Sequence, residues 1–155
     1  MDTDTSPHPS SGRRLRAVPP LHRQRRVDPR QALDADDRAL RRRVLAHSLQ
    51  EGRPLSADAV TAVLAAKAWR DELPDLYTES TVREMLWVDI LVWCEAHELE
   101  LPLDAPEALW SVLLVLHANG ALHPRSDSLE MLRRPLLDCG GLTRSGHRQP
   151  NLRTV

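Results

Sequence analysis

Asp89 and His117 are the polar side chains best placed to take part in chemistry, because each lies in a strongly apolar segment. On a helical projection at 100° per residue, Asp89 falls in the middle of the apolar face of the segment that begins at Thr81. His117 falls among the apolar positions of the segment that begins at Asp104. If these segments are antiparallel helices, Asp89 and His117 differ in height by roughly 5–6 Å. We therefore treat Asp89 and His117 as a candidate buried polar pair.

Other partners compete for the Asp89 carboxylate, because a buried carboxylate needs a hydrogen-bond donor. An arginine (Arg41, Arg42 or Arg133) or a tryptophan indole N–H could replace His117. In a further alternative, Asp89 borders a groove and stays hydrated. A cleft containing Asp89 and His117 would be the basis of a small enzyme, although pairs of this kind are more often structural.

Cys94 and His97 lie on adjacent turns of one predicted helix, a spacing that can ligate a metal ion. A zinc site needs about four ligands, and the sequence has no second Cys/His pair of matching spacing. We interpret Cys94 as a core residue and His97 as a residue that favours the negative end of a helix. Gly-x-Ser-x-Gly and phosphate-binding glycine motifs are absent from the sequence. The sequence therefore predicts no catalytic residue, metal or cofactor, and we expect a protein that is not an enzyme.

The net charge changes sign along the chain. Residues 1–30 carry seven arginines and three aspartates, a net charge of +4, whereas residues 31–155 carry 14 basic and 19 acidic side chains, a net charge of −5. Because a segment rich in Arg, Pro, Ser and Asp buries too little apolar surface to offset its chain entropy, we expect residues 1–32 to be a disordered arm. The candidate partner-binding residues in the arm are Arg13, Arg14, Arg16, Arg23, Arg25 and Arg26.

The abundance of arginine is a weak indication of nucleic-acid binding. The chain has 20 arginines but a single lysine, Lys67, which is typical of a GC-rich genome and leads us to expect a bacterial source. The arm also lacks aromatic residues that could stack on bases. Contact with phosphates through residues 13–26 stays an alternative.

Five segments have the apolar periodicity and end signals of helices. They span approximately residues 35–51, 56–73, 81–98, 104–119 and 127–141. Gly52 and Pro74 end the first two, and Pro135 predicts a kink or break near Arg134. Thr81 and Asp127 are expected to cap their helices, because each has a Glu three residues later. The fold class is therefore all-α: a compact bundle of about five helices over residues 33–141, followed by a disordered, flexible tail at 142–155.

The segments 81–98 and 104–119 are apolar on most sides, which predicts that they are the central helices and antiparallel neighbours. Residues 81–98 present Met, Leu, Trp, Val and Ile, so they do not suit DNA recognition. If five short helices cannot cover both segments, Trp87, Leu91 and Val115 would be surplus apolar surface. Trp87 and Leu91 are therefore candidate partner-binding residues.

Composition and motifs favour a cytoplasmic protein. No secretory signal or membrane span is predicted, and Cys94 and Cys139 are expected to be reduced. The leading functional hypothesis is a non-enzymatic helical module that binds another protein or itself, as a regulatory adaptor or small subunit. The alternatives are a nucleic-acid-associated regulator that uses its arm, and a small enzyme with an Asp89/His117 cleft.

Overall fold

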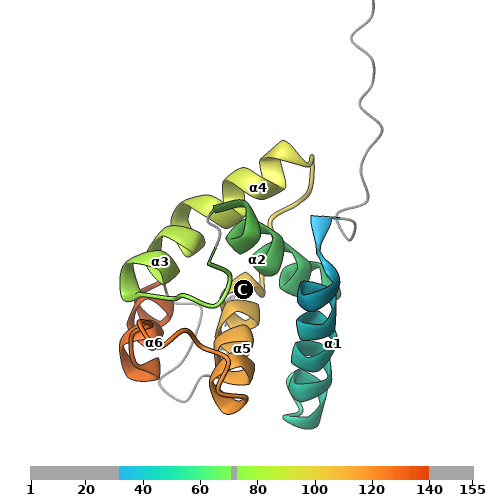
Figure 1. The fold of residues 1–155 in the computed structure, drawn as a ribbon. Helices are drawn as coiled ribbons and strands as arrows, with labels where there is room; N and C mark the ends of the chain where they lie inside the picture. Colours follow the sequence, from blue (N-terminus) through green and yellow to red (C-terminus); the bar gives the residue numbers. More distant parts are fainter. Residues whose placement is uncertain (1–31, 71–72, 140–155) are drawn as a thin grey trace, which may run out of the picture.

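The computed structural model describes residues 32–70 and 73–139, and all regular structure in those two ranges is helical. The elements are α1 (Ala35–Gln50), α2 (Ala57–Arg70), α3 (Glu79–Glu84), the π-helical turn η2 (Met85–Asp89), α4 (Ile90–Ala96), α5 (Ala105–Ala118) and α6 (Leu129–Asp138). Because α3, η2 and α4 are continuous, this part of the chain forms five helical rods (Figure 1), which confirms the predicted all-α bundle. Apart from residue 32, the predicted arm and tail lie outside the described residues.

The first helix, α1, begins and ends close to its predicted signals. The Asp34 carboxylate accepts a hydrogen bond of 2.8 Å from the backbone N–H of Asp37. Gly52 follows the helix with a φ of 66°, a left-handed conformation that glycine adopts without steric cost. The buried face of α1 consists of Leu40, Val44 and Ser48, and it packs against α2 and α5.

The central helix of the bundle is α2 rather than the segment 81–98. Ser56 caps α2 by accepting a 2.9 Å hydrogen bond from the N–H of Ala59. Every residue from Ala59 to Lys67 is buried. Four of these nine residues are alanines, whose small side chains let neighbouring helices approach from several sides. The second fully packed helix is α5, as predicted.

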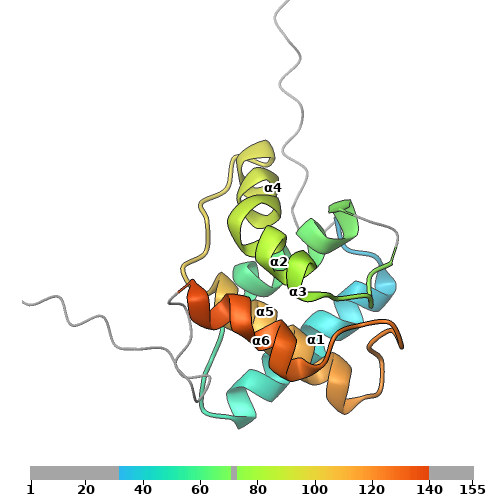
Figure 2. The same cartoon turned by 90° about the vertical axis from the view of Figure 1, so that its left-hand side faces the viewer.

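The predicted antiparallel pairing of 81–98 with 104–119 is not the main packing of these segments. Both α4 and α5 pack on α2, and α2 lies between them in two perpendicular views (Figures 1 and 2). The connection between α4 and α5 therefore passes α2 instead of closing a tight hairpin. This arrangement sets α4 at the edge of the bundle.

The third rod begins earlier than predicted. Its N-cap is Thr78, whose hydroxyl accepts a 3.1 Å hydrogen bond from the backbone N–H of Thr81. The capping box predicted between Thr81 and Glu84 is not used, because the Glu84 carboxylate interacts with Arg70 and with Ser80.

A π-helical turn interrupts the third rod and changes which residues face the core. The buried residues of the rod are Val82, Met85, Ile90, Trp93 and Cys94. Met85 and Ile90 are five residues apart, whereas an uninterrupted α-helix would bring Asp89 onto the face of Met85. The extra residue of the turn thus places Ile90 in the core and moves Asp89 to the rim.

Two aspartates that precede helices bind distant backbone groups instead of capping their own helices. The Asp104 carboxylate accepts a 2.7 Å hydrogen bond from the N–H of Ser56, before α2. The Asp127 carboxylate accepts one of 2.8 Å from the N–H of Glu79, at the start of α3. The predicted cap of α6 therefore falls to Ser128, which accepts a long 3.4 Å bond from Met131.

The last helix, α6, continues through the proline expected to break it. Pro135 is buried inside α6, which ends at Asp138. Pro135 and Leu136 both pack in the interior, and this burial stabilises the turn where a backbone hydrogen bond is missing. The helix is therefore not broken near Arg134.

Candidate functional site

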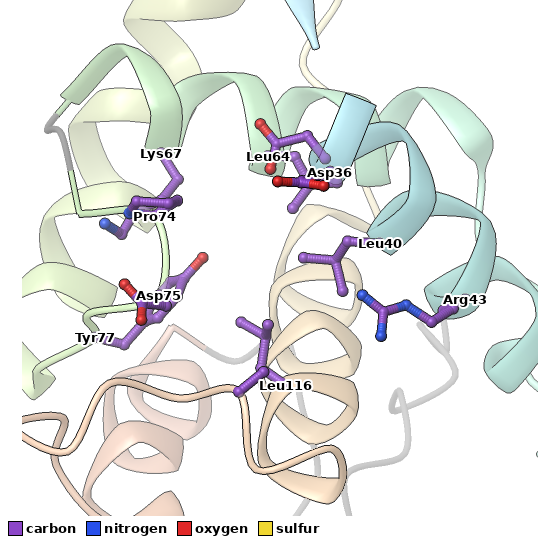
Figure 3. Close-up of a pocket in the computed structure, with 11 residues that line it drawn as sticks. Asp36, Leu40, Arg43, Leu64, Lys67, Pro74, Asp75, Tyr77 and Leu116 are labelled. Carbon is purple, nitrogen blue, oxygen red and sulfur yellow. The ribbon is translucent and has the colours of Figure 1, made fainter. Parts of the chain in front are cut away.

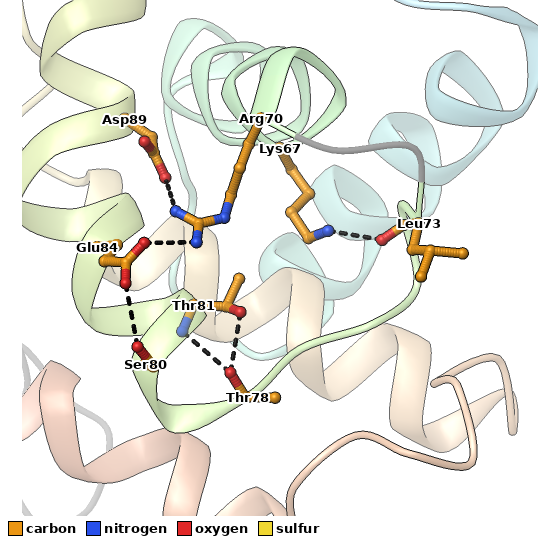
Figure 4. A network of polar contacts seen from close by, with 8 residues as sticks. All are labelled: Lys67, Arg70, Leu73, Thr78, Ser80, Thr81, Glu84 and Asp89. Carbon is orange, nitrogen blue, oxygen red and sulfur yellow. Dashed lines mark hydrogen bonds and ion pairs between the residues drawn. The ribbon is translucent and has the colours of Figure 1, made fainter.

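One arginine joins α2 to the π turn through two carboxylates (Figure 4). Nη1 of Arg70 donates a 2.6 Å hydrogen bond to Oδ2 of Asp89, and Nη2 forms an ion pair with Glu84. Glu84 also accepts a 3.1 Å hydrogen bond from the Ser80 hydroxyl. The bond to Asp89 is the main reason that the pKa of Arg70 is raised, and the bond from Arg70 is the main reason that the pKa of Glu84 is lowered.

The Arg70 network fixes the orientation of an exposed apolar surface. We define the tryptophan patch as Trp69, Trp87, Val88, Leu91 and Val92, all of which are exposed. Trp69 and Trp87 keep 57% and 60% of their surface in water, although tryptophan is normally well covered. Trp69, Val88 and Val92 line a shallow pocket of about 150 Å³ together with Arg70 and Asp89. Trp87 and Leu91, one turn apart, form the adjacent strip of the rod.

The segment that carries most of the tryptophan patch is acidic. The segment from Glu79 to Asp104, which holds four of the five patch residues, contains seven carboxylates and a single basic side chain other than histidine, Arg83, a net charge of −6. Glu95 follows Leu91 by one turn and is exposed. An apolar surface with Asp89 and Glu95 nearby favours a ligand with apolar anchors and positive charge.

The predicted partner-binding residues fall into two groups, and the structure describes only one of them. Trp87 and Leu91 are exposed on the third rod. Trp69, which was not predicted as a binding residue, is exposed at the end of α2 beside Val88 and Val92. Val115 is buried in α5 and does not contribute to this surface. The candidate arginines of the arm lie outside the described residues: Arg13, Arg14, Arg16, Arg23, Arg25 and Arg26.

The expected Asp89–His117 pair is not formed. Asp89 binds Arg70, which was not among the predicted partners, and His117 is exposed near the end of α5. The helical projection failed at Asp89 because the π turn shifts the register of the rod. It failed for the pair because α2 lies between α4 and α5.

The predicted arginine partners of Asp89 have other positions. Arg41 donates a 2.8 Å hydrogen bond to the Thr61 hydroxyl, and Arg42 is exposed. The guanidinium of Arg133 lies 5.7 Å from the centre of the Trp110 ring, a cation–π arrangement.

Cys94 and His97 are each held by contacts within the fold. Cys94 is buried, and burial raises the pKa of its thiol. The His97 ring stacks on Trp93 with centroids 4.4 Å apart, and its Nδ1 donates a 2.7 Å hydrogen bond to the Trp93 carbonyl. Among the residues that the structure describes, no group of three His, Cys, Asp or Glu side chains could hold a metal ion.

A second polar site lies between α1, α2 and the segment before α3 (Figure 3). It is a cavity of about 290 Å³, and Asp36, Asp37, Arg43, Lys67, Asp75 and Tyr77 are its polar lining residues. Apolar lining comes from Leu40, Leu64, Leu116, Pro74 and Ala121. Burial, with the charges of Asp34 and Asp36 as smaller causes, raises the pKa of Asp37 to about 6.

Lys67 is the only lysine of the chain and one of its most deeply buried side chains, with 1% of its surface exposed. Its ammonium donates a 2.6 Å hydrogen bond to the carbonyl of Leu73 and lies 5.0 Å from the centre of the Tyr77 ring. Lys67 thereby holds the chain that leads into α3 against α2. Sequence analysis missed this role, although a single lysine within a run of apolar residues was a usable signal.

Within residues 32–70 and 73–139, each helix is too short or too polar to span a bilayer. Comparison of the chain with protein-family models, with curated proteins and with solved structures gave no match. The function therefore has to be argued from the geometry of the two sites.

Proposed function

We propose that this protein is a non-enzymatic interaction module that binds another protein through the tryptophan patch. The observation that carries the proposal is the exposure of Trp69 beside Val88 and Val92, with which it lines a pocket, and of Trp87 and Leu91 on the adjacent strip of the third rod. Exposed tryptophans on a rigid surface are typical of the residues that dominate binding energy at protein interfaces. Contiguous exposed apolar surface is also costly in water unless a partner covers it.

The Arg70 network supports this proposal, because it prepares the surface for binding. Arg70 holds Asp89 and Glu84 on either side of the π turn, so Trp87 and Val88 are carried by a fixed backbone. A preorganised surface loses less conformational entropy on association than a flexible one. The same ion pairs place charged groups at the edge of the patch, where they favour partners with positive charge.

The experiment compares two double variants of the full-length chain as baits. Trp87→Ser with Leu91→Ser removes apolar surface inside the patch, whereas Leu49→Ser with Leu103→Ser removes exposed leucines outside it. A partner that binds the patch should lose at least tenfold in affinity with the first variant and bind the second variant like the original chain. Equal binding to both variants would contradict the proposal. Sedimentation of the bait alone distinguishes binding to a second copy from binding to another protein.

A further inference from the structure

We infer that residues 13–26 of this chain dock on the tryptophan patch and cover it in the free protein. The inference rests on the proposed function of the patch and names the chemistry that the patch recognises.

Charge complementarity is the first argument for this occupant. Residues 13–26 contain six arginines and no carboxylate, a net charge of +6, which opposes the net charge of −6 on Glu79–Asp104. Part of the acidic charge is already neutralised, because Arg70 pairs with Glu84 and Asp89. Glu95 and Glu100 are exposed near the end of α4.

The apolar residues of the segment are the second argument. Leu15, Val18 and Leu21 recur every third residue, and Pro19 and Pro20 follow Val18 directly. In a polyproline II conformation, which has three residues per turn, the three side chains would share one edge. Segments of this kind bind shallow surfaces lined by aromatic side chains, and they lose little entropy because proline restricts their free state. Trp69 and Trp87, with the pocket between Trp69, Val88 and Val92, provide such a surface.

The third argument is the position of the start of α1, where the chain joins the bundle. Asp36 and Asp37, in the first turn of α1, line the same cavity as Lys67 of α2. Trp69 and Arg70 lie further along the same helix, so the start of α1 lies beside the C-terminal part of α2, although Trp69 faces about 160° away from Lys67. The eleven residues between Leu21 and Leu33 allow these two residues to lie roughly 40 Å apart when the chain is extended. A tether of this length gives a local concentration on the order of millimolar, so a weak contact suffices for docking.

The experiment uses the full-length chain, in which 5-fluorotryptophan replaces tryptophan. The four labelled positions of the chain give separate ¹⁹F resonances. The resonances of Trp69 and Trp87 are assigned from Trp→Phe variants. The arm variant combines Leu15→Asp, Val18→Asp and Leu21→Asp. The matched control combines Thr3→Asp, Ser6→Asp and Ser10→Asp, which adds the same charge to the arm but leaves residues 13–26 intact.

The expected result is a change confined to the patch. The arm variant should shift the Trp69 and Trp87 resonances and increase their solvent isotope effect, while Trp93 and Trp110, which are buried, stay unchanged. The control should resemble the original chain. An unchanged spectrum in the arm variant, or equal shifts in both variants, would overturn the inference. A difference that disappears on dilution would assign the occupant to the arm of a second copy and would also overturn it.

The two proposals fail separately. If the arm variant leaves the spectrum unchanged while the Trp87/Leu91 double variant still loses its partner, only the docking of the arm is wrong. If the arm covers the patch but no partner depends on Trp87 and Leu91, the proposed function is wrong.

Discussion

Arg70 and Asp89, which are 19 residues apart, form a 2.6 Å hydrogen-bonded ion pair between the end of α2 and the end of the π turn. Their side chains keep 24% and 21% of their surface exposed, so the pair is only partly desolvated. This contact explains why an aspartate can stand in the most apolar segment of the chain. The π turn carries Asp89 out of the core and presents it to a cation.

Replacing Asp89 with alanine should lower the free energy of unfolding by about 1 kcal/mol, a value between those of exposed and buried charged pairs. The physical reason is the loss of the bond from Arg70, and urea denaturation at neutral pH measures it. Glu95→Ala is the control, because Glu95 is an exposed carboxylate on the same rod. An equal loss in both variants would show that the Arg70–Asp89 contact is not stabilising.

Deleting Val88 should leave the protein folded. The deletion places Ile90 four residues after Met85, so the π turn becomes an ordinary helical turn while Val82, Met85, Ile90 and Trp93 keep their buried face. Cooperative unfolding followed by circular dichroism should persist, with a loss of stability of about 1–2 kcal/mol. Deletion of Leu114 is the comparison, because the uninterrupted helix α5 has no extra residue to absorb a deletion. Loss of cooperative unfolding in the Val88 deletion would contradict the account of the π turn.

Replacing Lys67 with methionine should destabilise the fold by about 2 kcal/mol. Methionine fills a similar volume, but it cannot donate to the Leu73 carbonyl or place a cation over the Tyr77 ring. Thermal unfolding measures the loss. Arg83→Met, which removes a 3.2 Å ion pair with Glu79 from a side chain that is 47% exposed, should cost much less. A stabilising effect of Lys67→Met would show that burial of the ammonium outweighs its contacts.

Asp37 should make stability fall as pH rises from about 4 to about 6. Its folded-state pKa of about 6 lies above the unfolded value near 3.8, so the folded protein binds more protons than the unfolded protein in this window. The full difference between these two pKa values corresponds to about 3 kcal/mol in the free energy of unfolding. Because solvent screens this partly exposed carboxyl group, we expect about 1 kcal/mol.

The Asp37→Asn variant tests this pH dependence. It should be more stable than the original chain at pH 7.5 and equally stable at pH 4, where the carboxyl group is protonated in the folded protein. Asp58→Asn, at an exposed carboxylate in the first turn of α2, is the control. Urea denaturation of the three proteins at both pH values gives the comparison. A stability difference that does not change with pH would exclude Asp37 as the titrating group.

Helix ends were predicted well where the signal is local. Asp34 caps α1, Ser56 caps α2 and Gly52 follows α1 because each of these roles needs only neighbouring backbone groups. The capping prediction for Asp127 was wrong, since its carboxylate binds the N–H of Glu79, and the Asp104 carboxylate likewise binds the distant N–H of Ser56. Bonds across about 48 residues of sequence leave no trace in the local pattern.

The candidate site was predicted only in part. Trp87 and Leu91 were selected because their segment has more apolar residues than one face can bury, and both are exposed. Trp69 joins them because the end of α2 packs beside the π turn. The placement of Asp89 in the middle of the apolar face was wrong, because a helical projection assumes a constant angle per residue and one inserted residue rotates everything after it. The alternative in which Asp89 borders a groove agrees with the structure, where Asp89 lines the pocket and its side chain is 21% exposed.

The amino-acid sequence by itself determined that this chain forms a helical bundle, roughly where four of its rods begin and end, and that its third rod carries more apolar surface than it can hide. These properties follow from periodicity and capping, which act between residues a few positions apart. Only the tertiary structure decided that the alanine-rich α2 is the central helix, that Arg70 binds Asp89, and that Lys67 is buried beside Tyr77. Those outcomes depend on which helices pack together, and packing is settled by the fit of whole surfaces rather than by any local run of residues.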